Sequence, residues 1–314
     1  MKKKLNRTGI FLLVLTILLS LLVACVLSPE NATSSPIEVT DQLGRIVKLD
    51  IIPERIISLS PGNTEIIFAL GLADKLVAVT DYCDYPPEAA DKPSIGGFST
   101  PNIEQVIAYS PDIILAASIH EKRIIPQLED KDLPTLVLDP KTLNELLAAI
   151  NLIGEITGKV TDAVELATEL QNRIEAVTGK TDILPQEQRP RVLYIVWHDP
   201  LLAAGAETLQ DELIQRAGGE NIAHNLTGYA DISLEAVIGA NPKVIIAGTG
   251  HGDGAELTFQ FIKTETRLRD TDARKTEQIY KMDSNLSSRP GPRIVEGLKR
   301  FAEFIHPELF KKAR

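Results

Sequence analysis

Residues 104–116 have the sequence EQVIAYSPDIILA, and residues 235–247 have the sequence EAVIGANPKVIIA. At this offset of 131 residues, six of the thirteen positions are identical. Any helix–proline–strand unit resembles another to some degree, but the shared glutamate is a residue that burial alone does not select. Each copy has the pattern of a short helix, a proline turn and a buried strand. A unit used once in each half predicts a chain of two related lobes.

Short apolar runs alternate with helical patterns around the repeated unit. The runs lie at 56–60, 76–80, 113–117 and 135–138 in the first half, and at 192–196, 244–247 and 278–282 in the second. Near-continuous apolar strands that alternate with helices indicate parallel sheets covered on both faces. Between the halves, residues 142–178 contain no proline and repeat apolar residues at helical spacing, and Gly154 and Gly158 suggest a break or bend between two helical parts. We therefore predict an α/β fold of two lobes with a long helical connector.

The first 24 residues have the pattern of a secretory signal. Cations at positions 2–4 and 7 precede a largely apolar run over 10–24, which is shorter than the roughly 20 residues of a spanning helix. The run ends in Leu22-Val23-Ala24-Cys25, which resembles the lipobox of bacterial lipoproteins, where a protease cuts before the cysteine and the thiol carries a diacylglycerol. A plain N-terminal anchor helix is the alternative. Both place the folded part outside the cytoplasm, on the surface of the cell membrane.

Five parts are predicted along the chain. Residues 26–36 are rich in serine, proline, asparagine and threonine, so they cannot bury a core and indicate a flexible tether. The parts are a lipoprotein signal peptide (1–24), the tether (25–37), an N-terminal α/β lobe (38–140), the helical connector (141–180) and a C-terminal α/β lobe (181–314).

Composition and missing motifs exclude several classes of function. The chain is 44% apolar and 24% charged, as in an ordinary globular protein, and its net charge of −10 argues against a general nucleic-acid binder. If Cys25 carries a lipid, Cys83 is a lone thiol, which is more typical of a packing residue than of a metal ligand. The sequence has no G-x-S-x-G, H-E-x-x-H or P-loop motif, so we predict no enzyme.

Aromatic and polar side chains follow the predicted strands. In open α/β sheets, ligands bind beyond the carboxyl ends of the strands, and rings at those ends suit a flat or macrocyclic ligand. The residues at these ends include Asn63, Tyr82, Tyr85, His120, Trp197, His198, His251, Asn285 and Arg289.

Two of these histidines, His120 and His251, are related by the same offset of 131 residues as the repeated unit. If the lobes face each other, both can point into the cleft. We hypothesise that one or both contact the ligand, for example as nitrogen ligands to a bound metal centre. Ordinary loop histidines are the alternative.

Four segments resemble the ABC-transporter substrate-binding proteins for cobalamin and iron complexes. They are residues 55–65 (RIISLSPGNTE), 80–87 (TDYCDYPP), 96–98 with 102–104, and 288–293 (SRPGPR), and the resemblance covers roughly residues 37 to 308. It implies two Rossmann-like lobes with parallel sheets, joined by a single long helical connector, with the ligand cleft between the lobes. It also implies limited closure of the cleft on binding.

The resemblance also implies roles for individual residues. In this family one surface glutamate on each lobe meets arginines of the permease, and Glu104 and Glu235 match those positions. Phe98 replaces a stacking tryptophan, Asn285 falls where an aspartate is often found, and Arg289 matches an arginine that lines the cleft. The full set of candidate ligand-binding residues is Asn63, Tyr82, Tyr85, Phe98, His120, Trp197, His198, Tyr229, His251, Asn285 and Arg289.

The expected function is capture of cobalamin or a related corrinoid and its delivery to an ABC-transporter permease dimer with a cytoplasmic ATPase. A ferric-siderophore or heme binding protein is the first alternative, and a surface lipoprotein that binds a metal ion is the second. We expect a monomer with no intrinsic cofactor or metal, tied to the membrane by its lipid and binding no nucleic acid.

Overall fold

The computed structural model describes residues 36–250 and 256–310. The predicted signal peptide, Cys25, nearly all of the predicted tether and His251 lie outside these residues. The described residues from Ile37 onward belong to one compact unit. Within the described ranges, no helix combines the length and the apolarity that crossing a bilayer requires.

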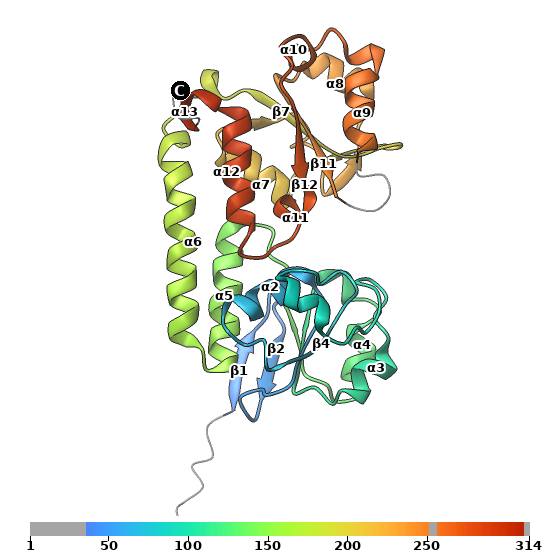
Figure 1. Ribbon diagram of the computed structural model, residues 1–314, viewed down its shortest axis with the longest axis vertical. Coiled ribbons are helices and arrows are strands. Elements are labelled where there is room, and N and C mark those ends of the chain that lie inside the picture. The colour runs from blue at the N-terminus through green and yellow to red at the C-terminus, as the bar shows by residue number, and fades with distance from the viewer. Residues whose placement is uncertain (1–35, 251–255, 311–314) are drawn as a thin grey trace, which may run out of the picture. The chain divides into compact units, whose positions relative to one another are not determined.

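The N-terminal lobe contains a four-stranded parallel sheet, as predicted (Figure 1). Its order is β4-β3-β5-β6, and its strands are β3 (Ile56–Ser58), β4 (Leu76–Val79), β5 (Ile113–Ala116) and β6 (Thr135–Val137). The helices of this lobe are α2 (Pro61–Ala69), α3 (Ile103–Ala108), α4 (Ile125–Glu129) and α5 (Leu143–Thr157). Every residue of β3, β5 and β6 is buried, which explains why these strands are near-continuous apolar runs.

An antiparallel hairpin precedes this sheet and was not anticipated from the sequence. It consists of β1 (Ile37–Thr40) and β2 (Ile46–Leu49). Burial along β2 alternates strictly between exposed and buried positions, as in a strand with one face on the core. Because β1 begins at Ile37, the predicted tether ends one residue too late.

The C-terminal lobe contains a mixed sheet of order β10-β8-β7-β11-β12, with β9 beside β7. Its strands are β7 (Arg191–His198), β8 (Leu201–Ala204), β9 (Glu220–Asn221), β10 (Tyr229–Asp231), β11 (Val244–Thr249) and β12 (Ile279–Asp283). The prediction of a parallel sheet holds for β7, β9, β11 and β12 but is wrong for the part that contains β8 and β10, because β8 pairs antiparallel with both β7 and β10. Only two residues join β7 to β8, and such a short connection allows only an antiparallel neighbour.

Helices cover the mixed sheet and link it to the first lobe. They are α6 (Val160–Thr181), α7 (Leu209–Arg216), α8 (Leu234–Ala240), α9 (Leu257–Thr264), α10 (Asp272–Lys275), α11 (Ser284–Ser287), α12 (Ile294–Ile305) and α13 (Pro307–Phe310). The predicted helical stretch is two helices, α5 and α6, separated at Gly158 in the left-handed conformation (φ 73°). Gly154, the other glycine expected to interrupt the stretch, lies buried inside α5. Helix α6 packs on α5 of the first lobe and on α7 and α12 of the second (Figure 1). With 22 residues it is about 33 Å long, and it is the single long connector between the lobes.

Close packing of α5 on α6 depends on Gly154, and this generates a stability prediction. A Cβ atom at Gly154 overlaps that of Ala163 and lies 3.0 Å from the Lys159 carbonyl oxygen. We expect Gly154→Ala to lower the free energy of unfolding by about 1–3 kcal/mol, as overpacking does. Urea unfolding measures this change.

Gly179 provides the matched control because it lies in α6, and a Cβ atom added there meets nothing within 4 Å. Gly179→Ala should raise the free energy of unfolding by about 0.5–1 kcal/mol through helix propensity. Equal effects of the two substitutions contradict the role given to Gly154.

Candidate functional site

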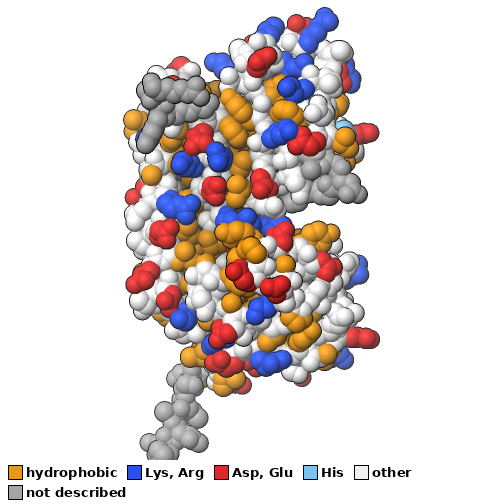
Figure 2. Space-filling view, viewed as in Figure 1, with side chains coloured by type: hydrophobic (Ala, Val, Ile, Leu, Met, Phe, Trp, Pro, Cys, Tyr) orange, Lys and Arg blue, Asp and Glu red, His pale blue; other side chains and the backbone are white. Residues whose placement is uncertain are grey.

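The two lobes touch where the start of α2 meets the loop before α12. A Cβ at Gly62 lies 2.7 Å from the Pro290 carbonyl oxygen, and a Cβ at Gly291 lies 2.9 Å from a carboxylate oxygen of Glu65. Both positions therefore accept only glycine without a shift of the neighbouring atoms. Figure 2 shows the notch between the lobes that opens beside this contact.

An ion pair between Glu65 and Arg293 joins the lobes at this contact. Arg293 donates from Nε to one carboxylate oxygen at 3.0 Å and from Nη2 to the other at 2.6 Å. The Glu65 side chain is 2% exposed. Burial raises the pKa of the Glu65 carboxyl, while the hydrogen bonds and charge of Arg293 oppose that rise. The guanidinium also lies 3.6 Å from the centre of the Tyr85 ring, so it positions one of the predicted ligand-binding rings.

A second pair across the lobes involves Arg289, a predicted cleft residue. Its guanidinium donates to both carboxylate oxygens of Asp84, and these hydrogen bonds lower the pKa of Asp84 despite partial burial. The Asp84 side chain is 58% exposed. Water therefore competes with Arg289 for the Asp84 carboxylate. The Arg289 side chain is itself only 11% exposed, so an anionic group that pairs with its guanidinium would have to displace Asp84.

Two predicted ligand-binding residues, Asn63 and His120, are fully buried. Asn63 donates its amide to the carbonyl oxygens of Ala116 and Leu138 at 3.1 and 3.3 Å. Both residues hold the ends of the sheet and present no atom to the notch.

Both ring nitrogens of His120 are occupied. Nδ1 accepts from the Ala117 amide at 3.0 Å, so Nε2 carries the proton and donates to the Phe98 carbonyl oxygen at 2.7 Å. Burial lowers the pKa of His120, which favours this neutral form. Neither nitrogen is free for a metal in this conformation, and the counterpart of His120 in the repeat, His251, is outside the described residues.

The exposed candidates lie in two groups, one on each lobe. In the N-terminal lobe Tyr82 is 58% exposed and Tyr85 41% exposed, and the half-buried Phe98 ring stands edge-on to His120 at 5.4 Å. In the C-terminal lobe the half-buried Trp197 ring lies 4.8 Å from that of His198.

The C-terminal group contains a third ring that sequence reasoning missed. Phe261 of α9 lies 5.9 Å from the His198 ring. Phe261 lies in a helix and does not follow a predicted strand, so a search for residues after strands could not reveal it. Trp197 is fixed by a hydrogen bond of 2.7 Å from Nε1 to the Asp199 carbonyl oxygen.

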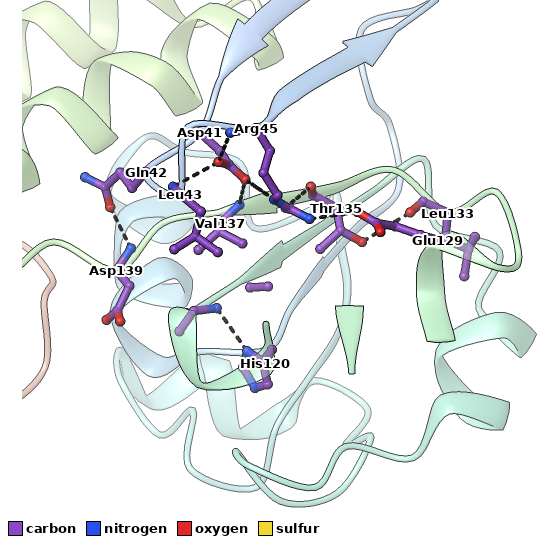
Figure 3. A network of polar contacts seen from close by, with 12 residues as sticks. Asp41, Gln42, Leu43, Arg45, His120, Glu129, Leu133, Thr135, Val137 and Asp139 are labelled. Carbon is purple, nitrogen blue, oxygen red and sulfur yellow. Dashed lines mark hydrogen bonds and ion pairs between the residues drawn. The ribbon is translucent and has the colours of Figure 1, made fainter. Parts of the chain in front are cut away.

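A network around Asp41 fixes the end of β6 (Figure 3). The Asp41 carboxylate accepts from the backbone and guanidinium of Arg45 and from the Val137 amide. The neighbouring Gln42 side chain accepts from the Asp139 amide at 2.6 Å. The β1–β2 hairpin thus fixes the position of the backbone where β6 ends.

Asp139 and Lys141 emerge from this network into a hollow between the lobes. They form a 2.8 Å ion pair and face Tyr229, whose hydroxyl donates to Gln210 at 3.2 Å. The hollow has a volume of about 210 Å³ and is lined by Asp139, Pro140, Lys141, Glu207, Thr208, Leu209, Gly228, Tyr229, Ser288 and Pro290. Asp139 and Lys141 were not among the candidates predicted from the sequence. Asp139 directly follows the predicted strand at 135–138, so its position at a strand end could have revealed it.

Unpartnered polar atoms mark two more of the predicted residues. His198 Nδ1 and Asn285 Oδ1 are buried and have no hydrogen-bond partner among the described residues. The same holds for Asn63 Oδ1. Buried polar atoms normally have partners, so these three atoms are unsatisfied in this conformation, and the two amide oxygens among them can only accept a hydrogen bond. Over the same residues, no group of three or more His, Cys, Asp or Glu side chains is arranged to hold a metal ion.

Known proteins resemble this chain over most of its length. A family model described as periplasmic binding protein matches residues 56–286. YvrC of Bacillus subtilis (strain 168), an uncharacterized ABC transporter substrate-binding lipoprotein, is 30% identical over 285 residues, 88% of this chain and 88% of that protein. A cobalamin-binding protein of Halobacterium salinarum is 26% identical over 285 residues, 88% of this chain and 76% of that protein. The apo form of RhuT, a periplasmic heme-binding protein from Roseiflexus sp. RS-1, superposes with a TM-score of 0.71 at 25% identity, covering 81% of this chain and 98% of that one.

The Glu65–Arg293 pair generates a stability prediction. Glu65→Gln leaves the partly buried guanidinium without a countercharge, so we expect the free energy of unfolding to fall by about 3 kcal/mol. Urea unfolding at neutral pH measures this fall. Glu38→Gln in the ion pair with Lys48 is the matched control, because both of these side chains are more than half exposed, and it should cost less than about 1 kcal/mol. A loss for Glu65→Gln no larger than for Glu38→Gln rules out the buried pair as the main link between the lobes.

Proposed function

Because the chain belongs to the family of periplasmic binding proteins, we propose that it captures cobalamin or a related corrinoid outside the cytoplasm and delivers it to an ABC-transporter permease. Substrate-binding proteins of ABC importers bind a small molecule and work with permease and ATPase components. Membership of the family does not fix which ligand the chain binds, since one relative is named for cobalamin and a solved neighbour for heme.

The main support for a corrinoid ligand is that each lobe has aromatic side chains among the candidate binding residues. Tyr82, Tyr85 and Phe98 lie on the N-terminal lobe, and Trp197 lies on the other. Aromatic rings on both lobes suit a ligand with two broad apolar faces. A corrin ring has two such faces, and its amide side chains can use the unpartnered atoms of His198 and Asn285.

The hollows between the lobes favour an open cleft as the site. The hollow beside Tyr229 has a volume of about 210 Å³, smaller than the roughly 300–1,000 Å³ of ordinary ligand pockets. A second hollow of about 430 Å³ shares Lys141 with it and is lined by the acidic side chains of Glu145, Asp211 and Glu212, which do not suit an apolar ring. A corrinoid therefore lies across the open notch, with a polar substituent in the hollow beside Tyr229, where Lys141 supplies positive charge for a phosphate or carboxylate.

Heme is the second candidate, and a single residue favours it. The Tyr82 ring is 58% exposed, and a tyrosine oxygen is one of the ligands that bind heme iron. Ferric siderophores belong to the same alternative. For a bare metal ion the described residues offer no cluster of ligands.

The remaining parts of the proposal concern the membrane. Cys25 carries the lipid that anchors the chain, and Glu104 and Glu235 dock on the permease. Both glutamates are exposed near the start of their helices, α3 and α8. Cys83 has no part in binding, because its thiol is buried and hydrogen-bonded to Thr64 and Thr80.

Calorimetric titration with cyanocobalamin, hemin and a ferric siderophore tests the ligand. We expect cyanocobalamin to bind with quenching of Trp197 fluorescence, and Phe98→Ala or Trp197→Ala each to weaken binding about tenfold through lost stacking. Phe310→Ala is the control, since that ring lies in α13 and stacks with Lys180.

Two results change the proposal. Binding of hemin but not cyanocobalamin, lost in Tyr82→Phe, establishes the heme alternative. Binding of none of the three ligands overturns the ligand class.

A further inference from the structure

Two exposed isoleucines occupy the same place in the two copies of the repeated unit. Ile107 lies in α3 and Ile238 in α8, at the offset of 131 residues that relates the copies. Each is 39% exposed. A single exposed apolar residue is ordinary, but the same one at both equivalent positions requires a common reason.

Each isoleucine shares a helix face with a glutamate. Ile107 follows Glu104 by three residues, and Ile238 follows Glu235 by three, a spacing that brings side chains together on one side of a helix. The buried residue between them is a valine in both helices, Val106 or Val237. The valine therefore fixes the helix to its lobe, and the glutamate–isoleucine face points outward.

Among the exposed positions of the two helices, only the glutamate and the isoleucine of this face are identical in both copies. Along 103–108 and 234–239 burial follows one pattern, half-buried, exposed, exposed, buried, exposed and exposed. Of the four exposed positions, two differ: Gln105 becomes Ala236, and Ala108 becomes Gly239. Burial explains the retained valine, but neither burial nor the fold explains why glutamate and isoleucine are retained on the surface.

The carboxylates of this face are free to meet a partner. Within the described ranges no ion pair involves Glu104 or Glu235. Arg267 lies close enough to Glu235 for their charges to interact, but its guanidinium is held by Glu265 at 2.9 Å. In the view of Figure 1, α3 and α8 both lie away from the connector α6.

We propose that each lobe docks through a two-residue contact, a glutamate that meets a basic side chain and an isoleucine that enters an adjacent apolar pocket. A face used twice fits a partner that presents the same surface twice, namely two copies of one permease subunit. Exposed charges guide and orient an encounter, whereas burial of apolar side chains slows dissociation. Ile107 and Ile238 therefore slow dissociation of the complex with the permease, whereas Glu104 and Glu235 guide its formation. This inference rests on the proposed function and adds the apolar half of its docking surface.

Binding of the ligand-free and ligand-loaded chain to the host's own permease–ATPase complex in nanodiscs tests the proposal. For the double variant Ile107→Ser with Ile238→Ser, we expect dissociation to be at least tenfold faster with little change in the association rate. Each single variant should give a smaller loss of similar size. Ile46→Ser is the matched control, because Ile46 is 62% exposed on β2 outside the repeated unit.

Three readouts separate the ways in which this test can fail. Unchanged thermal unfolding and unchanged cyanocobalamin affinity show that the isoleucine variants fold and bind. Normal dissociation of the double isoleucine variant, together with slowed association of Glu104→Gln with Glu235→Gln, overturns this inference and leaves glutamate docking intact. Normal kinetics for both double variants overturn the docking part of the proposed function itself.

Discussion

The buried pair of Glu65 and Arg293 is the constraint on which the arrangement of the lobes depends. Removing two charges from water is costly, and only good geometry with both hydrogen bonds offsets the cost. Here the guanidinium binds both carboxylate oxygens, and the glycines at 62 and 291 let the backbones come close enough for it. Any rotation that separates the lobes at this point leaves both charges unpaired, so the pair resists opening.

This constraint, together with α6, makes the cleft a largely preformed site. Rings that are already fixed on each lobe lose little freedom when a ligand arrives, which favours affinity. The pair of Arg289 and Asp84 differs from the Glu65–Arg293 pair, since the Asp84 carboxylate is 58% exposed and open to water. The lobes are thus tied by a buried carboxylate at Glu65 and by an exposed carboxylate at Asp84.

The sequence predicted the strands and helices whose pattern is purely local, such as β3, β5 and β6, which are fully buried apolar runs. Most of the strands it missed, β1, β2, β8 and β10, form antiparallel pairs. Of the two glycines expected to interrupt the helical stretch, Gly158 does so. A residue that follows a strand is expected at the carboxyl edge of the sheet, but the sequence does not show where its side chain points. Asn63 and His120 turn inward to carbonyl oxygens, while Asp139 turns outward because the β1–β2 hairpin holds its backbone.

The sequence by itself determined the two-lobe α/β fold, the helical link and the repeated glutamate–isoleucine pattern, because periodicity and repeats record local burial directly. Only the tertiary structure decided that the helical stretch divides into α5 on the first lobe and the connector α6, that Arg289 pairs with Asp84 and that Glu65 is buried against Arg293. Residues 65 and 293 are separated by 228 positions, and no local pattern records a partner at that distance. Whether a side chain binds a ligand, another lobe or its own backbone is fixed by which groups the fold brings within hydrogen-bonding reach.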